Sequence, residues 1–161
     1  YGGILFIDEA YSLARGGEKD FGKEAIDCLV KSMEDHKHEI ILILAGYQKE
    51  MESFLSTNPG LRSRFPIHID FPDYNKEELL QIAEQMCQKR QYRLSDGAKK
   101  LLSTILAPQK NDLHEFGNAR TVRNIIEKAI RKQAVRLVVK SSTTREELML
   151  IEAHDLAEVE K

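Results

Sequence analysis

Two short apolar runs near the start of the chain most constrain its fold. Residues 4–7 are all apolar and stop at an Asp-Glu pair, while residues 40–45 are rich in β-branched side chains and stop at a glycine. A run that is apolar on both faces is typical of a strand buried in a parallel sheet. Apolar residues at helical spacing over residues 21–35 predict a connecting helix, and alternation over residues 67–71 predicts a third short strand. These segments together predict an α/β fold.

After residue 73 the pattern becomes helical only. Asn75, with a glutamate three residues later, forms the capping-box signature that opens a helix, and Ser95 is placed to cap the next one. A long helix is predicted from about residue 118 to residue 139. We therefore expect two domains, an α/β part at residues 1–73 and a helical part at residues 74–161.

Composition argues against several classes of partner. The 161 residues carry a formal charge of −2 with a pI of about 6.3, which gives no general attraction to nucleic acids or anionic membranes. The longest apolar run is far shorter than the roughly 20 residues that a membrane span requires. The long helix is basic but has no interleaved aromatic residues, which favours a solvated or subunit-facing surface over nucleic-acid binding. Cys28 and Cys87 lack partners at metal-ligand spacing, so we expect two reduced, buried thiols in a cytoplasmic protein.

The Asp-Glu pair after the first apolar run is the strongest candidate for chemistry. Open parallel sheets bind ligands at the carboxyl ends of their strands, where this pair would lie. Hydrolysis of a nucleoside triphosphate needs a metal ion to neutralise the phosphates and a base to orient the attacking water. We assign Asp8 to a Mg²⁺ ion and Glu9 to the water. On the dipeptide alone, a solvated pair that caps the following helix is an equally good interpretation.

Three motifs, in order along the chain, resemble the AAA+ family of ATPases. Residues 2–13 resemble its Walker B segment, residues 58–65 its arginine-finger region, and residues 117–120 its sensor 2 motif. The resemblance covers essentially the whole chain. It implies an incomplete P-loop NTPase (AAA+) sheet followed by the all-helical lid of that family. Within the family, residues 3–22, 42–47 and 71–74 closely resemble proteins of spore formation in bacilli. Red-type Rubisco activases are similar but more distant.

The resemblance also implies roles for individual side chains. In AAA+ rings the nucleotide lies between subunits, and an arginine of the neighbouring subunit reaches its γ-phosphate. By motif spacing Arg64 is the first candidate for this finger and Arg62 the second, while Arg120 matches the lid arginine that contacts nucleotide in its own subunit. Tyr47 stands at the sensor 1 position, where the family usually has a polar residue, often Asn. A packed aromatic at the end of a strand is an equally good interpretation of Tyr47.

The resemblance further implies ligands and partners. The ligands are ATP and Mg²⁺. The partners are copies of the same chain in a homo-oligomeric, hexameric ring, together with an unidentified protein substrate. By position, residues 15–20 would face the central pore, where their charges could touch a threaded polypeptide.

The phosphate-binding loop of such ATPases, Gly-x-x-x-x-Gly-Lys-Ser/Thr, does not occur in these 161 residues. That loop holds the phosphates with backbone N–H groups and a lysine. The resemblance implies an ATP-driven, protein-remodelling AAA+ ATPase of sporulation. Because the loop is missing, we interpret the chain as the C-terminal part of such a protein and expect it to be inactive alone. By the resemblance, the missing strand would lie between residues 40–45 and 67–71, so its absence would leave sheet edges unpaired and apolar faces exposed. A non-catalytic assembly scaffold with the same fold is the alternative.

Overall fold

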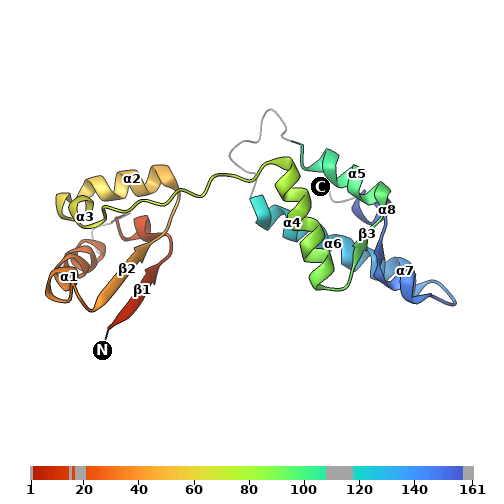
Figure 1. Ribbon diagram of the computed structural model, residues 1–161, viewed down its shortest axis with the longest axis horizontal. Helices are drawn as coiled ribbons and strands as arrows, with labels where there is room; N and C mark the ends of the chain where they lie inside the picture. Colours follow the sequence, from red (N-terminus) through yellow and green to blue (C-terminus); the bar gives the residue numbers. More distant parts are fainter. Residues whose placement is uncertain (1, 15, 17–20, 108–117, 158–161) are drawn as a thin grey trace. The chain divides into compact units, whose positions relative to one another are not determined.

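The computed structural model describes residues 2–14, 16, 21–107 and 118–157. The chain divides into two compact units, residues 1–70 (unit 1) and residues 71–161 (unit 2), each with its own hydrophobic core (Figure 1). Among the described residues, no helix has both the length and the apolar character needed to cross a membrane.

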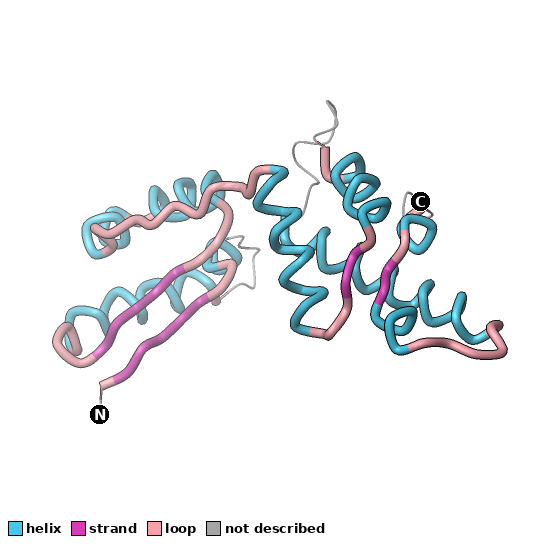
Figure 2. Tube along the Cα trace, turned by 45° about the vertical axis from the view of Figure 1, so that its right-hand side comes forward, coloured by secondary structure: helices cyan, strands magenta, loops and turns pink. Residues whose placement is uncertain are grey.

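Unit 1 is built on a two-stranded parallel sheet. The strands lie side by side in Figure 2 and pair in register from Gly3 opposite Ile40 to Ile7 opposite Leu44. Both predicted strands and the predicted helix between them are confirmed. The elements of this part are β1 (Gly3–Ile7), the 3₁₀ helix η1 (Ala10–Ala14), α1 (Gly22–Asp35) and β2 (Ile40–Leu44).

Two further helices complete unit 1, α2 (Gln48–Thr57) and α3 (Pro59–Arg64). The Asn58 side chain caps α3 by accepting a hydrogen bond from the Gly60 N–H at 2.8 Å. The predicted third strand at residues 67–71 is wrong for this structure, because these residues form no ladder. A strand is stabilised by hydrogen bonds to a neighbouring strand. In the described residues the sheet of unit 1 consists of β1 and β2, and residues 67–71 pair with neither of them.

The core of unit 1 lies on one side of its sheet only. The helices and η1 bury a small cluster against that side, namely Ala10, Tyr11, Ile26, Phe54 and Leu61. On the other side, the register places Ile4 beside Ile41 and Phe6 beside Ile43. These four side chains are between 43% and 69% exposed. The expectation of exposed apolar faces is therefore confirmed for the described residues.

The described residues of unit 2 are helical apart from one short parallel strand pair. The capping box at Asn75 is confirmed, and the Ser95 hydroxyl accepts a hydrogen bond from the Ala98 N–H at 3.1 Å, as its cap position predicts. The elements are α4 (Lys76–Lys89), β3 (Arg93–Leu94), α5 (Asp96–Ile105), α6 (Asn118–Val138), α7 (Arg145–Met149), β4 (Leu150–Ile151) and α8 (Ala153–Leu156).

The core of unit 2 is formed mainly by α4, α5 and α6. Leu79, Leu102 and Ile126 represent these helices and are each at most 3% exposed. Cys87 on α4 is buried in this core, as expected, but Cys28 on α1 is exposed, so the prediction of two buried thiols is wrong for Cys28. Both cysteines are free.

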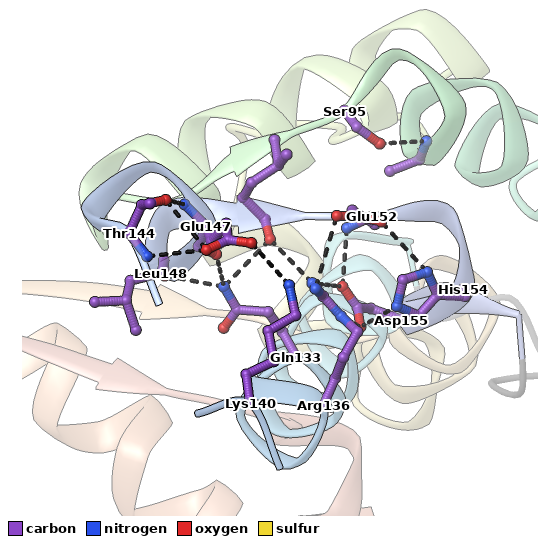
Figure 3. A network of polar contacts seen from close by, with 12 residues as sticks. Ser95, Gln133, Arg136, Lys140, Thr144, Glu147, Leu148, Glu152, His154 and Asp155 are labelled. Atoms are coloured by element: carbon purple, nitrogen blue, oxygen red, sulfur yellow. Dashed lines mark hydrogen bonds and ion pairs between the residues drawn. The ribbon is translucent and has the colours of Figure 1, made fainter. Parts of the chain in front are cut away.

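A polar network fixes the C-terminal elements of unit 2 to α6 (Figure 3). The Gln133 amide Nε2 donates to the carbonyl oxygens of Glu147, Leu148 and Leu150 at 3.1, 2.9 and 3.2 Å. One turn further along α6, Arg136 donates from Nε and Nη2 to the two carboxylate oxygens of Asp155 at 3.0 and 2.9 Å. These contacts satisfy polar groups that the packing of α7 and α8 would otherwise bury without partners.

The Asp155 carboxylate is the most deeply placed charge of this network, with its side chain 1% exposed. Burial disfavours its charged form. Hydrogen bonds from Arg136 and from the Glu152 backbone N–H outweigh that cost and hold the pKa of Asp155 below its ordinary value. Asp155 is therefore held as a paired anion.

Candidate functional site

Two carboxylates stand at the carboxyl end of β1. Asp8 and Glu9 are both exposed, and Asp8 Oδ1 accepts a hydrogen bond from the Glu9 N–H at 3.0 Å. Glu9 has a φ of 48°, in the left-handed region that few residues other than glycine adopt. Such strained backbone occurs preferentially at functional sites, where the surrounding structure holds it in place. Here the next residue, Ala10, is fixed by its N–H to the Ala45 carbonyl oxygen at 3.0 Å.

Tyr47 lies just beyond the end of β2, which is next to the end of β1 in the register. Asp8, Glu9 and Tyr47 therefore share one edge of the sheet. The Tyr47 ring is 66% exposed, and its centroid is 6.4 Å from that of the Tyr11 ring. Gln48, the polar neighbour of Tyr47, instead donates to Glu52 Oε1 at 3.3 Å.

Gly46 allows this edge to pack closely. A Cβ added to Gly46 would lie 2.8 Å from both Met51 Sδ and Tyr11 Cδ1. Only glycine fits at this approach, because real Cβ atoms do not come so close to such neighbours. The buried Tyr11 thus supports the backbone that leads to Tyr47.

The donor set at this edge fits a magnesium ion. In the described part of the chain, no group of three His, Cys, Asp or Glu side chains could hold a metal on its own. Mg²⁺ does not need such a cage, because it is usually bound through one or two carboxylates with water and substrate phosphates. The exposed Asp8 carboxylate meets that requirement.

The two arginines of α3 have different surroundings. Arg64 forms an ion pair from Nη2 to Glu34 Oε1 of α1, and its Nη1 donates to the Gly60 carbonyl oxygen at 3.0 Å. The Arg64 side chain is 26% exposed. Arg62 is exposed and makes no ion pair within the described residues. The structure thus holds Arg64 on its own unit and leaves Arg62 in solvent.

Arg120 lies in the first turn of α6, in unit 2, and its side chain is exposed. Asn118, at the start of this helix, has a φ of 48° and bonds to the segment that precedes α4. Its Oδ1 accepts from the Tyr74 N–H at 3.1 Å, and its Nδ2 donates to Asp73 Oδ1 at 2.5 Å. The predicted pore-facing loop at residues 15–20 lies, apart from Gly16, outside the described residues.

Sequence reasoning missed the roles of Asn118 and Glu34. Asn118 carried a usable signal, since asparagine tolerates positive φ and often precedes helices. Glu34 carried none, because its partner Arg64 is 30 positions away and is brought close only by the packing of α3 on α1.

Comparison with known proteins identifies the family. Residues 2–73 match the family described as "ATPase family associated with various cellular activities (AAA)", and residues 75–161 match the family "AAA lid domain". The chain belongs to the AAA family. Its architecture is accordingly part of an AAA α/β domain followed by a lid, as the motif resemblance implied.

Three relatives illustrate the similarity within the family. The chain is 59% identical to stage V sporulation protein K of Bacillus subtilis over 158 residues, which is 97% of this chain and 49% of that protein. It is 44% identical to a CfxQ homolog of Galdieria sulphuraria over 96% of the chain and 52% of that protein. It is 45% identical to protein CbbX of Cereibacter sphaeroides over 88% of the chain and 46% of that protein. The chain therefore spans about half the length of these relatives.

Proposed function

We propose that this chain is part of an ATP-hydrolysing AAA+ protein, with its catalytic acids at the carboxyl edge of β1. The observation that carries the proposal is the strained turn at Glu9. This turn holds two exposed carboxylates at that edge in a chain of the AAA family.

Each side chain at the edge has a role in this proposal. Asp8 would hold the Mg²⁺ ion, which when bound would neutralise charge on the ATP phosphates. The Glu9 carboxylate accepts a hydrogen bond from the attacking water and orients it towards the γ-phosphate. Tyr47 follows β2 at the same sheet edge, and in this proposal its hydroxyl hydrogen-bonds the same water. The exposure of all three side chains is what a site completed by a nucleotide requires.

The proposal assigns the arginines to two different nucleotides. Arg64, with Arg62 as the alternative, reaches the γ-phosphate bound to a neighbouring subunit, and a planar guanidinium can bridge two phosphate oxygens there. Arg120 contacts the nucleotide of its own subunit from the lid. This arrangement requires a homo-oligomeric ring, which we propose is a hexamer.

The phosphate-binding loop belongs, in this proposal, to sequence that precedes residue 1, and the 161 residues alone do not hydrolyse ATP. The exposed apolar face of the β1–β2 sheet supports this view, because an uncovered face of this kind marks a surface that another segment normally covers.

The biological activity that we propose is ATP-driven remodelling of a protein substrate in the cytoplasm, in spore formation. Its support is the 59% identity to a relative named stage V sporulation protein K. A non-catalytic assembly module is the second candidate, because the domain matches describe the fold of the AAA family and are equally consistent with it.

The test is ATP turnover by a longer protein that includes the phosphate-binding loop. We expect Glu9→Gln to bind ATP but lose turnover, and Arg64→Ala to lose roughly 10³- to 10⁵-fold in kcat, the range for arginine fingers. Glu50→Gln removes an exposed acid of α2 and serves as the matched control, with turnover unchanged. Rings that mix Glu9→Gln and Arg64→Ala subunits should regain turnover if the finger acts across subunits. A longer protein that binds ATP and never hydrolyses it would instead favour the assembly module.

A further inference from the structure

The ion pair between Glu34 and Arg64 joins two separate helices of unit 1. Glu34 lies in the last turn of α1, and Arg64 is the last residue of α3. The Arg64 guanidinium is bound on two sides, by Glu34 Oε1 at Nη2 and by the Gly60 carbonyl oxygen at Nη1. Its position therefore depends on a side chain outside its own helix.

Other contacts fix α3 on α1 and keep this geometry defined. Asn58, the cap of α3, donates from Nδ2 to Asp27 Oδ1 of α1 at 3.5 Å, and Leu61 is 1% exposed in the core. A Cβ added to Gly60 would lie 3.0 Å from Arg64 Nη1 and 3.7 Å from Val30 Cγ1 of α1. The surface that carries Arg64 is thus closely packed, and Glu34 acts on a guanidinium with little room to move.

We propose that Glu34 is a positioning residue that presents Arg64 to the nucleotide of a neighbouring subunit. This inference rests on the proposed function. A guanidinium has five N–H donors, and the Gly60 carbonyl and the Glu34 carboxylate engage two of its nitrogens. The remaining donors stay available on a side chain that is 26% exposed. A finger held in advance loses less freedom when it meets the phosphate, and such orientation lowers the barrier of the chemical step.

Arg62 provides the internal comparison. It lies two residues before Arg64 on the same short helix, yet it is exposed and makes no ion pair in the described part of the chain. A long side chain without a partner must be ordered during each turnover. The Glu34 contact therefore favours Arg64 over Arg62 as the arginine that reaches the neighbouring nucleotide.

The pair is suitable for mutation because Glu34 is 58% exposed, and exposed ion pairs add little to folding stability. In the longer, ring-forming protein we expect Glu34→Ala to lower kcat by roughly tenfold. An exposed ion pair contributes an energy equivalent to about a fivefold change in rate, and displacing a catalytic group by about 1 Å lowers the rate by roughly 10²-fold. The expected loss lies between these two values. The KM for ATP should stay within about twofold, since the subunit's own nucleotide contacts are unchanged. Glu34→Gln, which keeps an acceptor oxygen, should lose less, and Asp35→Asn, an exposed neighbour on α1, is the matched control.

Two further measurements separate positioning from a general structural effect. Adding Glu34→Ala to Arg64→Ala should cause no further loss, because Glu34 acts through Arg64. Mixed rings of Glu34→Ala and Glu9→Gln subunits should regain turnover, because the intact Arg64 of a Glu9→Gln subunit serves the nucleotide of its Glu34→Ala neighbour.

Several outcomes would overturn this role. Glu34→Ala turnover that equals or exceeds wild type would show that Glu34 does not present the finger. If Glu34→Ala lowers turnover just as much in the Arg64→Ala background, Glu34 does not act through Arg64. If Arg64→Ala itself leaves turnover intact, the finger assignment in the proposed function is wrong, and that pattern differs from failure of Glu34 alone.

Discussion

The two units of this chain differ in how completely they bury their apolar surface. In unit 2, helices close around a core in which Ala83, Leu102 and Ile126 are at most 1% exposed. In unit 1, one side of the sheet is covered by helices, while Phe6 and Ile41 on the other side are 58% and 59% exposed. Within the described residues, the helical unit encloses its core, whereas the α/β unit leaves one face of its sheet exposed.

The difference follows from how each kind of element satisfies its backbone. A helix makes its hydrogen bonds within itself, so three packed helices can complete a core. A strand depends on neighbours, and sheets of two strands are marginal without further strands or packing. The segment after α3 shows the consequence, because Ile67, Ile69 and Phe71 alternate like a strand but are 80%, 74% and 89% exposed.

The two units therefore differ in what they contribute to the protein. We expect unit 2 to supply most of the folding free energy, whereas the proposed catalytic acids Asp8 and Glu9 lie in unit 1.

The largest contrast expected is in thiol reactivity. Cys87 of unit 2 is 1% exposed, and burial raises its pKa to about 11. At pH 8 only about 10⁻³ of such thiols are ionised, and the thiolate is the reactive form. An alkylating reagent should therefore label Cys28 of unit 1 and leave Cys87 unmodified, as peptide mass spectrometry would show. Rapid labelling of Cys87 in the native chain would mean that unit 2 opens readily, and Cys28→Ser is the control that removes the exposed thiol.

A second contrast lies between the buried and the exposed ion pair. Asp155→Ala removes the partner of Arg136 in unit 2 and should lower the free energy of unfolding by roughly 3–5 kcal/mol, as breaking a buried pair does. Glu34→Ala breaks the exposed pair of unit 1 and should cost less than about 1 kcal/mol. Urea unfolding followed by circular dichroism measures both. Glu146→Ala, an exposed acid on α7, is the control for unit 2, and equal costs for Asp155 and Glu34 would contradict the comparison.

The cores themselves give the third test. Leu102→Ala leaves a cavity in unit 2 and should cost about 2–5 kcal/mol, the usual range for a buried leucine. Phe6→Ala truncates a larger side chain in unit 1 but should cost less than about 1 kcal/mol, because this ring is mostly in solvent. In a longer protein that covers the sheet, Phe6→Ala should become costly. A Phe6→Ala cost that stays small there would mean that the face remains uncovered.

Local sequence patterns predicted most elements of both units. β1, β2 and α1 followed from apolar spacing, and the helix starts at Asn75 and Ser95 followed from side chains that bond backbone N–H groups a few residues away. Such signals involve residues close together in the sequence, so they do not depend on contacts with distant parts of the chain.

The parts that could not be predicted depend on contacts between distant residues. Nothing near residues 67–71 reveals whether a partner strand is present, so the alternation suggested a strand that the structure lacks. Cys28 fits a helical pattern, yet which face of α1 is buried depends on the sheet and α3. The Glu34–Arg64 pair likewise exists only because two helices pack together. The positions of Asp8, Glu9 and Tyr47 at one sheet edge needed only the strand order, but their roles remain proposals.

The smallest effect concerns the pH dependence of unit 2. Lys140 Nζ bonds Glu147 Oε1 at 2.7 Å, and the Thr144 N–H bonds Glu147 Oε2 at 2.9 Å. The Lys140 contact first and the Thr144 backbone second lower the pKa of Glu147 from 4.5 to about 2. Because the pKa is lower in the folded chain, this group stabilises the fold above about pH 4.5 and loses that contribution as the pH falls towards about 2.

Glu147→Gln tests this dependence, because it removes the charge but keeps an acceptor for the Thr144 cap. The wild-type thermal midpoint should exceed that of the variant at neutral pH, and the two should converge between about pH 4.5 and about pH 2. The pKa of Asp155 is also lowered, so its contribution falls in the same direction, but it is common to both chains and cancels in their difference. A difference that is constant with pH would show that the Glu147 charge does not support the network. In that case the other contacts of unit 2, among them its apolar core and the Arg136–Asp155 pair, would supply its stability.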